Sequence, residues 1–358
     1  MGLLIKPYLG CNLKCKYCYE GSLREKKEPE MKYDINALLK VIREHKDEQP
    51  DIGLHGGEIL MLPNKDIEKL LAEIYKHKKR TTLQTNATLI DDEKIKLFKK
   101  YKTNIGVSWD GPGDLCDFRP GTKNVGNIID KLISEGISVG MIIVVSEANA
   151  GTKEKREKLK KWIYEISKEK GIDARFNPCY GLPGLELHPK KRVSVYLEFA
   201  KFCVENGIYW SPFTDIVRKL QDKKAVCAFM GCDIFCTESA VSVMGDGSLT
   251  NCMRTNQEYI LLRDKKEIKT RDEILQNIPQ KYGGCKECKY FHNCRGGCPT
   301  SAIDNDWRNR TSWCEVWYAL FSYFENIRKF AEFGKKEENN ANPRWEKKGY
   351  SDHTDEFI

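Results

Sequence analysis

Three cysteines near the start of the chain have the spacing of a metal-binding loop. Cys11, Cys15 and Cys18 are separated by three and then by two residues, shortly after an apolar run at residues 3–5. Three thiolates on a tight loop can hold three irons of a 4Fe–4S cube, since cysteine is the usual ligand of such clusters. The next cysteine, Cys116, lies far along the chain, so one iron stays open for an external ligand, as in catalytic metal sites. A zinc site or three buried thiols would have the same spacing.

The aromatic residue before the last of these cysteines is Tyr17. The motif Cys-x3-Cys-x-aromatic-Cys resembles that of the radical S-adenosylmethionine (radical SAM) enzymes. The resemblance implies that the methionyl amine and carboxylate of S-adenosylmethionine (SAM) fill the open position of the cluster, with Tyr17 beside the cofactor.

The elements that must position this loop alternate between strand and helix from residue 1 to about 210. Six strand–helix units in succession predict an α/β fold with parallel strands and right-handed crossovers. The pattern fits either an open doubly wound sheet or a barrel. The radical SAM resemblance implies a partial, TIM-like (β/α)6 barrel that is open on one side. The predicted strands span residues 3–8, 52–55, 81–85, 104–109, 138–145 and 174–177.

Polar motifs follow the predicted strands at their carboxyl ends, where ligands bind in parallel α/β folds. Gly56, Gly57 and Glu58 follow the second strand. Glycine lets the backbone approach a ligand closely, and a glutamate can accept hydrogen bonds from an ammonium group. The resemblance implies that this Gly-Gly-Glu contacts the methionyl amine of SAM. It also assigns Asn86 and Ser108 to the SAM site. It assigns Arg119 to the carboxylate of SAM.

Three other cysteines in this half of the chain have simpler interpretations. Cys179 follows the sixth predicted strand, where it could donate a hydrogen atom to a radical, although a small buried hydrophobe is the more common role. Cys116 and Cys203 are predicted to be structural.

Eight cysteines lie between Cys232 and Cys314, and a predicted β-hairpin around the turn 245–248 separates the first two from the rest. Paired Cys-x2-Cys units also occur in zinc ribbons, but the full order, with Gly-x4-Cys at 247–252, resembles the SPASM extension of anaerobic sulfatase maturases and peptide-modifying radical SAM enzymes. The resemblance implies two auxiliary 4Fe–4S clusters. The first would be held by Cys236, Cys252, Cys298 and either Cys232, which we favour, or Cys227. The second would be held by Cys285, Cys288, Cys294 and Cys314.

Composition and charge restrict the class of protein. The chain has 358 residues, 40% of them hydrophobic, and a net charge of +8, which is ordinary for a soluble globular protein. Basic residues alternate with acids at 153–162, which predicts a solvated helix face. Nucleic-acid binding is not favoured, because no aromatic-interleaved basic patch is present.

The chain has fifteen cysteines, an odd number, and no secretory signal. This combination favours metal binding over disulfides. Without an apolar run that could cross a bilayer, the protein is predicted to be cytoplasmic and not to bind membranes.

We therefore predict four segments: the partial barrel at 1–210, a helical bridge at 211–231, the SPASM domain at 232–320, and a helix end with a polar tail at 321–358. The resemblance implies an enzyme with three 4Fe–4S clusters that cleaves SAM to methionine and a 5′-deoxyadenosyl radical. It also implies an external one-electron reductant of the flavodoxin or ferredoxin type. The radical would take hydrogen from a peptide or protein, giving oxidation or a thioether, C–C or C–O cross-link.

Three alternatives remain open: oxidation of a sulfatase cysteine or serine to formylglycine, radical chemistry on a small molecule, and a non-enzymatic iron–sulfur or zinc protein. In sulfatase maturases a catalytic aspartate follows the cysteine of Gly-x4-Cys, whereas here Met253 follows Cys252. This departure lowers the expectation of formylglycine formation, with three candidate replacement bases: Asp246, Glu238 and Glu20. Because the sequence begins at the first strand, a leader peptide, if one is needed, would be read by the barrel mouth, the Cys-rich domain or a separate partner.

Overall fold

The computed structural model describes residues 2–20, 32–47, 51–179, 181–223, 241–250, 252 and 271–327. Contacts divide the chain into two compact units: Met1–Ile143 with Ala240–Arg263, and Val144–Ser239 with Asp264–Ile358. Some of the residues predicted to act lie outside the described ranges, and their roles stay predictions: Cys227, Cys232, Cys236 and Glu238.

The first unit is built on a parallel sheet whose strands pair in the order of the sequence. These strands are β1 (Leu3–Ile5), β2 (Ile52–Leu54), β3 (Thr81–Thr85), β4 (Thr103–Ser108) and β5 (Val139–Val145), and each is parallel to the next. A doubly wound sheet reverses its strand order at a switch point. The order from β1 to β5 runs in one direction, as in a barrel, which resolves the choice that the sequence left open.

The first strand is shorter than predicted, because it ends at Ile5 instead of Tyr8. Pro7 has no N–H to donate to a neighbouring strand, and the residues after it leave the sheet. The backbone of Tyr8 and Gly10 instead accepts hydrogen bonds from Gly57 at 3.0 Å and from Glu58 at 2.8 Å. The chain thus leaves the sheet toward the turn that follows β2.

The predicted hairpin is present as β7 (Val241–Val243) and β8 (Leu249–Thr250), which are antiparallel. Asp246 accepts hydrogen bonds from the amide and hydroxyl of Ser248 at 2.9 and 2.6 Å and so stabilises the turn. β7 also pairs in parallel with β1, a placement that the sequence did not predict.

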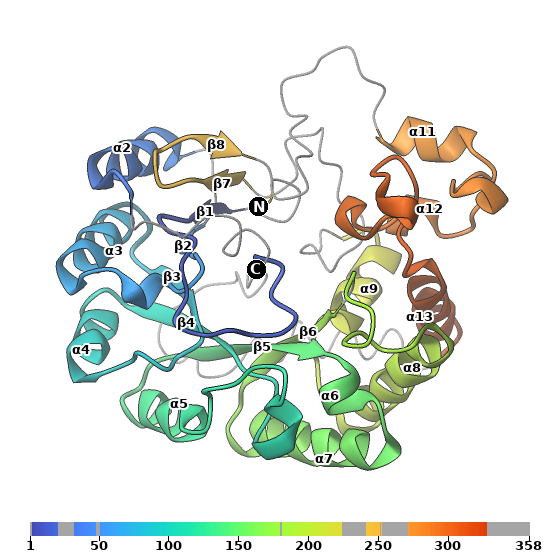
Figure 1. The fold of residues 1–358 in the computed structure, drawn as a ribbon, viewed down its shortest axis with the longest axis horizontal. Coiled ribbons are helices and arrows are strands. Elements are labelled where there is room, and N and C mark those ends of the chain that lie inside the picture. Colours follow the sequence, from blue (N-terminus) through green and yellow to red (C-terminus); the bar gives the residue numbers. More distant parts are fainter. Residues whose placement is uncertain are drawn as a thin grey trace. The chain divides into compact units, whose positions relative to one another are not determined.

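Helices α2 (Ile35–His45), α3 (Asn64–Lys78), α4 (Asp92–Lys100) and α5 (Val125–Ser134) lie outside the strands of this unit (Figure 1). Short 3-10 helices follow β2 and β4 at Ile59–Met61 and Gly113–Cys116. The apolar stripe of α3 is fully buried at Ile67, Leu70, Leu71 and Ile74. Side chains at spacings of three and four residues share one helix face, so the stripe covers the sheet and leaves the carboxyl ends of the strands to the loops.

The second unit is mainly helical. Among the described residues of this unit, the strand β6 (Asp173–Pro178) leads to Cys179, whose amide donates to the Val145 carbonyl at 3.0 Å. The helices come next in sequence order: α6 (Glu147–Ala150), α7 (Lys153–Tyr164), the π-helix η3 (Glu165–Glu169), α8 (Pro189–Asn206), α9 (Phe213–Leu220), α11 (Arg271–Asn277), η4 (Gln280–Tyr282), α12 (Phe291–Cys294), η5 (Pro299–Ser301), η6 (Ile303–Asn305) and α13 (Cys314–Asn326).

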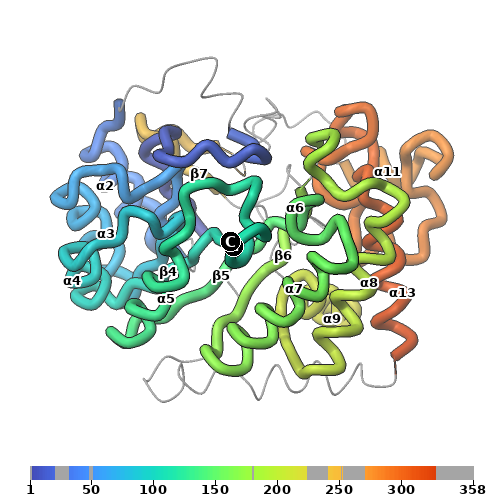
Figure 2. The backbone as a smooth tube through the Cα atoms, turned by 60° about the horizontal axis from the view of Figure 1, so that its bottom comes forward, coloured from blue at the N-terminus to red at the C-terminus, as the bar shows by residue number. Residues whose placement is uncertain are grey.

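Aromatic side chains hold the helical core of this unit together. Helices α8, α9 and α13 run close together (Figure 2). Tyr196 of α8 makes edge contacts with the rings of Trp313 at 5.6 Å and Trp317 at 6.2 Å between centroids. Phe213 of α9 lies 6.2 Å from Phe324 of α13. Helix α9 falls in the segment predicted as a helical bridge, and its apolar face packs on α13.

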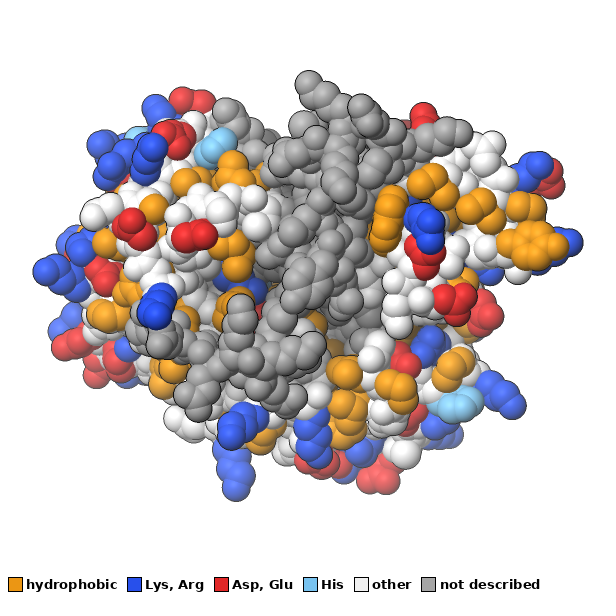
Figure 3. All heavy atoms as spheres, turned by 45° about the horizontal axis from the view of Figure 1, so that its top comes forward, with side chains coloured by type: hydrophobic (Ala, Val, Ile, Leu, Met, Phe, Trp, Pro, Cys, Tyr) orange, Lys and Arg blue, Asp and Glu red, His pale blue; other side chains and the backbone are white. Residues whose placement is uncertain are grey.

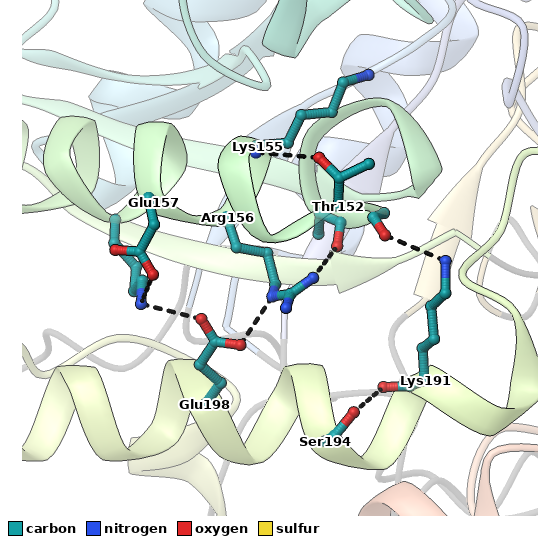
Figure 4. A network of polar contacts seen from close by, with 10 residues as sticks. Thr152, Lys155, Arg156, Glu157, Lys191, Ser194 and Glu198 are labelled. Carbon is teal, nitrogen blue, oxygen red and sulfur yellow. Dashed lines mark hydrogen bonds and ion pairs between the residues drawn. The ribbon is translucent and has the colours of Figure 1, made fainter.

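The basic stretch at 153–162 joins two helices through ion pairs. Arg156 and Lys160 of α7 both bind the carboxylate of Glu198 on α8, at 2.7 and 2.9 Å (Figure 4). Lys191 donates to the carbonyl of Gly151 at 3.1 Å. The charges that we expected to face solvent therefore lie in part between α7 and α8.

Basic and acidic side chains of the described residues are intermixed over the face shown in Figure 3. Ion pairs at the surface of the first unit include Lys99 with Glu135 at 2.7 Å and Arg43 with Glu73 at 3.0 Å. Within the described ranges, no helix has both the length and the apolar character needed to cross a membrane.

Candidate active site and thiol clusters

The loop that follows β1 brings Cys11, Cys15 and Cys18 together. All three side chains are half-buried, and the amide of Cys18 donates to the Cys15 carbonyl at 3.1 Å. Burial, together with the neighbouring thiols Cys18 and Cys11, raises the pKa of the Cys15 thiol to about 11, and Arg119 opposes the shift. These thiols are close enough to interact electrostatically, as ligands of one centre must be.

The three thiols of the loop are of the ligand type that iron–sulfur clusters use. A zinc ion needs its ligands about 2.0–2.3 Å from one centre, whereas each iron of a cube takes one thiolate. Cys116 interacts with Thr122 and the backbone of Asp110, as expected of a structural cysteine.

The turn after β2 packs against the start of this loop. A Cβ atom on Gly57 would lie 2.2 Å from the carbonyl oxygens of both Leu9 and Gly10, and one on Gly56 would lie 3.0 Å from the Tyr8 carbonyl. The glycines therefore permit a close approach between two backbone segments of the protein itself. This contact fixes the thiol loop relative to Glu58.

We expect Gly57→Ala to displace the thiol loop and to destabilise the protein by about 1–3 kcal/mol, as overpacking does. Gly56→Ala should cost less, because its new methyl group would meet only one carbonyl, at the longer distance. Urea unfolding of both variants, together with their iron content after anaerobic reconstitution, measures the difference. Equal stability and equal iron content in Gly57→Ala and the wild type would contradict the prediction.

Glu58 is held by three hydrogen bonds at the carboxyl ends of the strands. Its carboxylate accepts from the Thr85 hydroxyl and the Asn86 amide, each at 2.7 Å, and from the Leu60 amide at 3.1 Å. Burial raises the pKa of Glu58, and these hydrogen bonds and Arg119 oppose that shift. The carboxylate is thus fixed beside the thiol loop, where an ammonium group could bind it.

Asn86 connects β3 to the thiol loop. Its side-chain amide donates to Asn12 Oδ1 at 2.9 Å and lies 3.7 Å from the Cys11 sulfur. Asn12 in turn donates to the Thr88 hydroxyl at 2.8 Å. Ser108, at the end of β4, accepts a hydrogen bond from Gln84 at 2.7 Å.

Arg119 and Tyr17 meet beside the thiols. The Arg119 guanidinium lies 5.4 Å from the centre of the Tyr17 ring, and both side chains contact Asp110. Burial opposes the charge of Arg119, but its acidic neighbours, Tyr17 and then Asp110, raise its pKa. Asp110 was not predicted from the sequence, and its contacts place it beside Tyr17 and Arg119.

A buried ion pair holds the far end of the thiol loop. Lys6, just after β1, binds Glu20, and both side chains are nearly inaccessible to solvent. Glu20 was a candidate base, and in this structure its carboxylate is engaged by Lys6. No motif in the sequence indicated that these two residues pair.

His55 gives the first unit a predicted dependence on pH. Burial first, and then Lys6, lowers the pKa of His55 to about 4. In the unfolded state the His55 imidazole binds a proton below about pH 6.5, whereas in the folded state it does so only below about pH 4. The free energy of unfolding should therefore fall as the pH drops from about 6.5 to about 4. The loss is at most about 3 kcal/mol, and partial solvent access reduces it.

We expect His55→Asn to flatten this dependence, since asparagine can keep the hydrogen bond from the Gly56 amide without titrating. Urea unfolding of the metal-free protein at pH 4.5 and 7.5 is the measurement. The same pH dependence in variant and wild type would show that His55 does not contribute.

The second unit contains four thiols that interact with one another. Burial and the neighbours Cys314 and Cys288 raise the pKa of Cys285 to about 12. Burial and the other three thiols raise the pKa of Cys294 to about 12. This set is the one that the resemblance implied for the second auxiliary cluster, and its members lie together.

Two arginines place positive charge near these thiols. Arg271 is fully buried, and its guanidinium donates to carbonyl oxygens that include Gly297 at 2.8 Å and Asn309 at 2.8 Å. Arg310 lowers the pKa of Cys314, against the larger effect of burial. A cluster bound by four thiolates is an anion, so the positive charges suit it.

Two candidate ligands of the predicted first auxiliary cluster and the candidate hydrogen donor also lie within the described residues. Cys252 is half-buried after β8, and Cys298 is buried with its sulfur 3.1 Å from the Thr300 hydroxyl. The predicted first auxiliary cluster also needs residues outside the described ranges. Cys179 is buried at the end of β6, near enough to Tyr196 to raise that phenol's pKa after the larger effect of burial.

Comparison with known proteins agrees with this geometry. Residues 5–163 match the model of the radical SAM superfamily. The chain carries a radical SAM domain. The chain is 26% identical over 370 residues to a cysteine-type anaerobic sulfatase-maturating enzyme of Clostridium perfringens (strain 13 / Type A), covering 90% of this chain and 96% of the relative. A serine-type sulfatase-maturating enzyme of Bacteroides thetaiotaomicron is 31% identical over 166 residues, 41% of this chain and 40% of the relative.

Solved structures share the fold. The structure of anSMEcpe with bound AdoMet (SAM) matches with a TM-score of 0.71 at 22% identity, over 94% of this chain and 99% of that one. Streptococcus suis SuiB bound to its precursor peptide SuiA matches with a TM-score of 0.58 at 17% identity, over 87% and 75%. The predicted α/β fold class is confirmed, and the radical SAM domain with its sulfatase-maturating relatives marks the chain as an enzyme. The domain boundaries stay predictions.

Proposed function

We propose that this radical SAM enzyme oxidatively modifies a peptide or protein side chain. The observation that carries the proposal is the presence of two thiol sites in one chain. One is the three-cysteine loop beside Glu58, and the other is the four-thiol set of the second unit. Similarity to sulfatase-maturating enzymes over 90% of the chain supports a peptide substrate.

The residues present suit the cofactors that the family uses. Cys11, Cys15 and Cys18 would bind three irons of the first cluster, and Glu58 would accept the ammonium group of SAM. When bound, the cluster and SAM would supply a 5′-deoxyadenosyl radical; such chemistry belongs to the cofactor, and the protein contributes orientation and exclusion of competing reactions. Asn86 and Ser108 are proposed to face SAM and Arg119 to bind its carboxylate.

The four-thiol set of the second unit is proposed to hold an auxiliary 4Fe–4S cluster, and Cys252 and Cys298 to contribute to another. Net oxidation of a substrate releases an electron after hydrogen abstraction, and a cluster can accept it. An external flavodoxin- or ferredoxin-type protein would supply the electron that starts each turnover. A separate leader-binding partner and a cytoplasmic location stay predictions.

Formylglycine formation is the second candidate, favoured by similarity to relatives that are named anaerobic sulfatase-maturating enzymes. Against it stands Met253 in place of the expected aspartate. In this structure Asp246 stabilises a turn and Glu20 binds Lys6, so neither has the open position of a base. We therefore favour oxidation or cross-linking that does not depend on that aspartate.

The test uses anaerobically reconstituted protein, SAM and dithionite. One arm contains synthetic sulfatase-motif peptides with cysteine or serine at the target position, and the other contains any short cysteine-, aromatic- or lysine-containing precursor peptide that is encoded beside this gene. Mass spectrometry distinguishes an aldehyde from a loss of two hydrogens. Modification of the precursor peptides alone supports the proposal, formylglycine in the sulfatase peptides supports the second candidate, and absence of 5′-deoxyadenosine in every arm would refute both.

A further inference from the structure

Asp110 is a buried carboxylate to which three segments of the first unit converge. Only 2% of its surface is exposed. Its Oδ2 atom accepts a hydrogen bond from the Tyr17 hydroxyl, and the Arg119 Nε lies 3.4 Å from the same oxygen. Asp110 follows β4, Tyr17 lies in the thiol loop, and Arg119 lies in the segment that precedes α5. One carboxylate oxygen thus joins all three.

Tyr17 and Arg119, which both contact Asp110, belong to different parts of the proposed site: the cluster-binding loop and the SAM carboxylate site. Tyr17 stands between two proposed iron ligands, Cys15 and Cys18. Arg119 is the proposed ligand of the SAM carboxylate and is close enough to Glu58 to lower the pKa of that group. Its Nε faces Asp110, and the described residues provide no hydrogen-bond partner for its two terminal nitrogens. Those nitrogens present the paired donors that suit a carboxylate.

The backbone reinforces this connection. The Lys16 amide donates to the Phe118 carbonyl at 2.8 Å, and the Lys16 ammonium lies 5.2 Å from the centre of the Phe118 ring. The residues before Tyr17 and Arg119 are therefore in contact as well. The thiol loop and the segment that carries Arg119 are thus joined by a backbone hydrogen bond as well as through Asp110.

Charge explains why the shared residue is an aspartate. Arg119 is 8% exposed, and a buried cation without a counter-charge is strongly unfavourable. Before SAM arrives, Asp110 is the carboxylate that Arg119 contacts. By binding Nε alone, it can hold the guanidinium in place and leave the other donors for the ligand.

We propose that Asp110 is a positioning residue that couples the cluster-binding loop to the SAM carboxylate site through Tyr17 and Arg119. The inference rests on the proposed SAM site and concerns binding and cluster geometry. It can therefore be tested without a peptide substrate, so its failure is distinct from failure of the proposed peptide chemistry.

The experiment measures SAM binding by equilibrium dialysis and the electron paramagnetic resonance (EPR) spectrum of the reduced cluster with and without SAM, in reconstituted protein. Asp110→Asn keeps the shape of the side chain and removes its charge. We expect SAM to bind about tenfold more weakly, the loss typical of a charge-assisted contact. The spectral change on adding SAM should also be smaller than in the wild type.

A double variant separates positioning from general damage. If Asp110 acts through Arg119, Asp110→Asn combined with Arg119→Lys should bind SAM no more weakly than Arg119→Lys alone, because coupled residues are not additive. Asp91→Asn is the matched control, since it removes the carboxylate that caps α4 and contacts Lys94, and its SAM affinity should equal that of the wild type.

Tyr17→Phe provides the test if Asp110→Asn fails to retain iron. It removes only the hydroxyl that contacts Asp110, and it should weaken SAM binding about threefold and alter the EPR change. The proposal is overturned if Asp110→Asn binds SAM as the wild type does, if its effect multiplies that of Arg119→Lys, or if Tyr17→Phe leaves both readouts unchanged.

Discussion

Cys15→Ala is expected to abolish SAM cleavage. Cys15 is the middle ligand of the proposed cluster, and without it the loop keeps only Cys11 and Cys18. Because the cofactor performs the bond cleavage, its loss should lower 5′-deoxyadenosine formation by at least about three orders of magnitude. The assay contains dithionite and SAM under anaerobic conditions, with iron content and circular dichroism recorded on the same samples.

Cys203→Ala is the matched control, because this cysteine is fully buried in helix α8 and has no proposed ligand role. It should keep both its iron and its activity. Full SAM cleavage by folded Cys15→Ala would remove the basis of the proposed site, and loss of activity in Cys203→Ala would show that cysteine replacement acts through folding.

Cys288→Ala should separate SAM cleavage from product formation. Cys288 interacts with Cys285 and Cys294 in the second unit. Its removal should lower iron from about twelve to about eight atoms per chain, since each cube contains four. The first cluster would remain, so 5′-deoxyadenosine should still form, while modified peptide should fall at least about a hundredfold.

The ratio of modified peptide to 5′-deoxyadenosine is the measured quantity, and Cys203→Ala again provides the reference. Two results would contradict this division of tasks. One is equal loss of cleavage in Cys15→Ala and Cys288→Ala when both are folded. The other is zinc in place of iron at the four-thiol set of the wild type, because zinc does not change oxidation state.

Local patterns in the sequence predicted most of the elements and many of the site residues. The buried stripe of α3 and the hairpin at Val241–Thr250 follow from periodicity and turn composition, which depend on neighbours within a few residues. Glu58 was singled out by its position at the carboxyl end of the second predicted strand, whereas Asn86 was assigned by the radical SAM resemblance. The predicted end of β1 lies three residues after the observed end. The residues after Ile5 leave the sheet because their backbone hydrogen-bonds to the turn at Gly57, and that turn is distant in sequence.

The sequence by itself determined the kinds of ligand available and their spacing, because cysteines within eight positions can bind one centre only if the loop between them is short. The tertiary structure alone decided which distant groups face them. Asp110 meets Tyr17 and Arg119, Lys6 meets Glu20, and β7 pairs with β1. The physical reason is that burial forces every charged or hydrogen-bonding group to find a partner, and the partner is chosen by the packing of the sheet and not by distance along the chain.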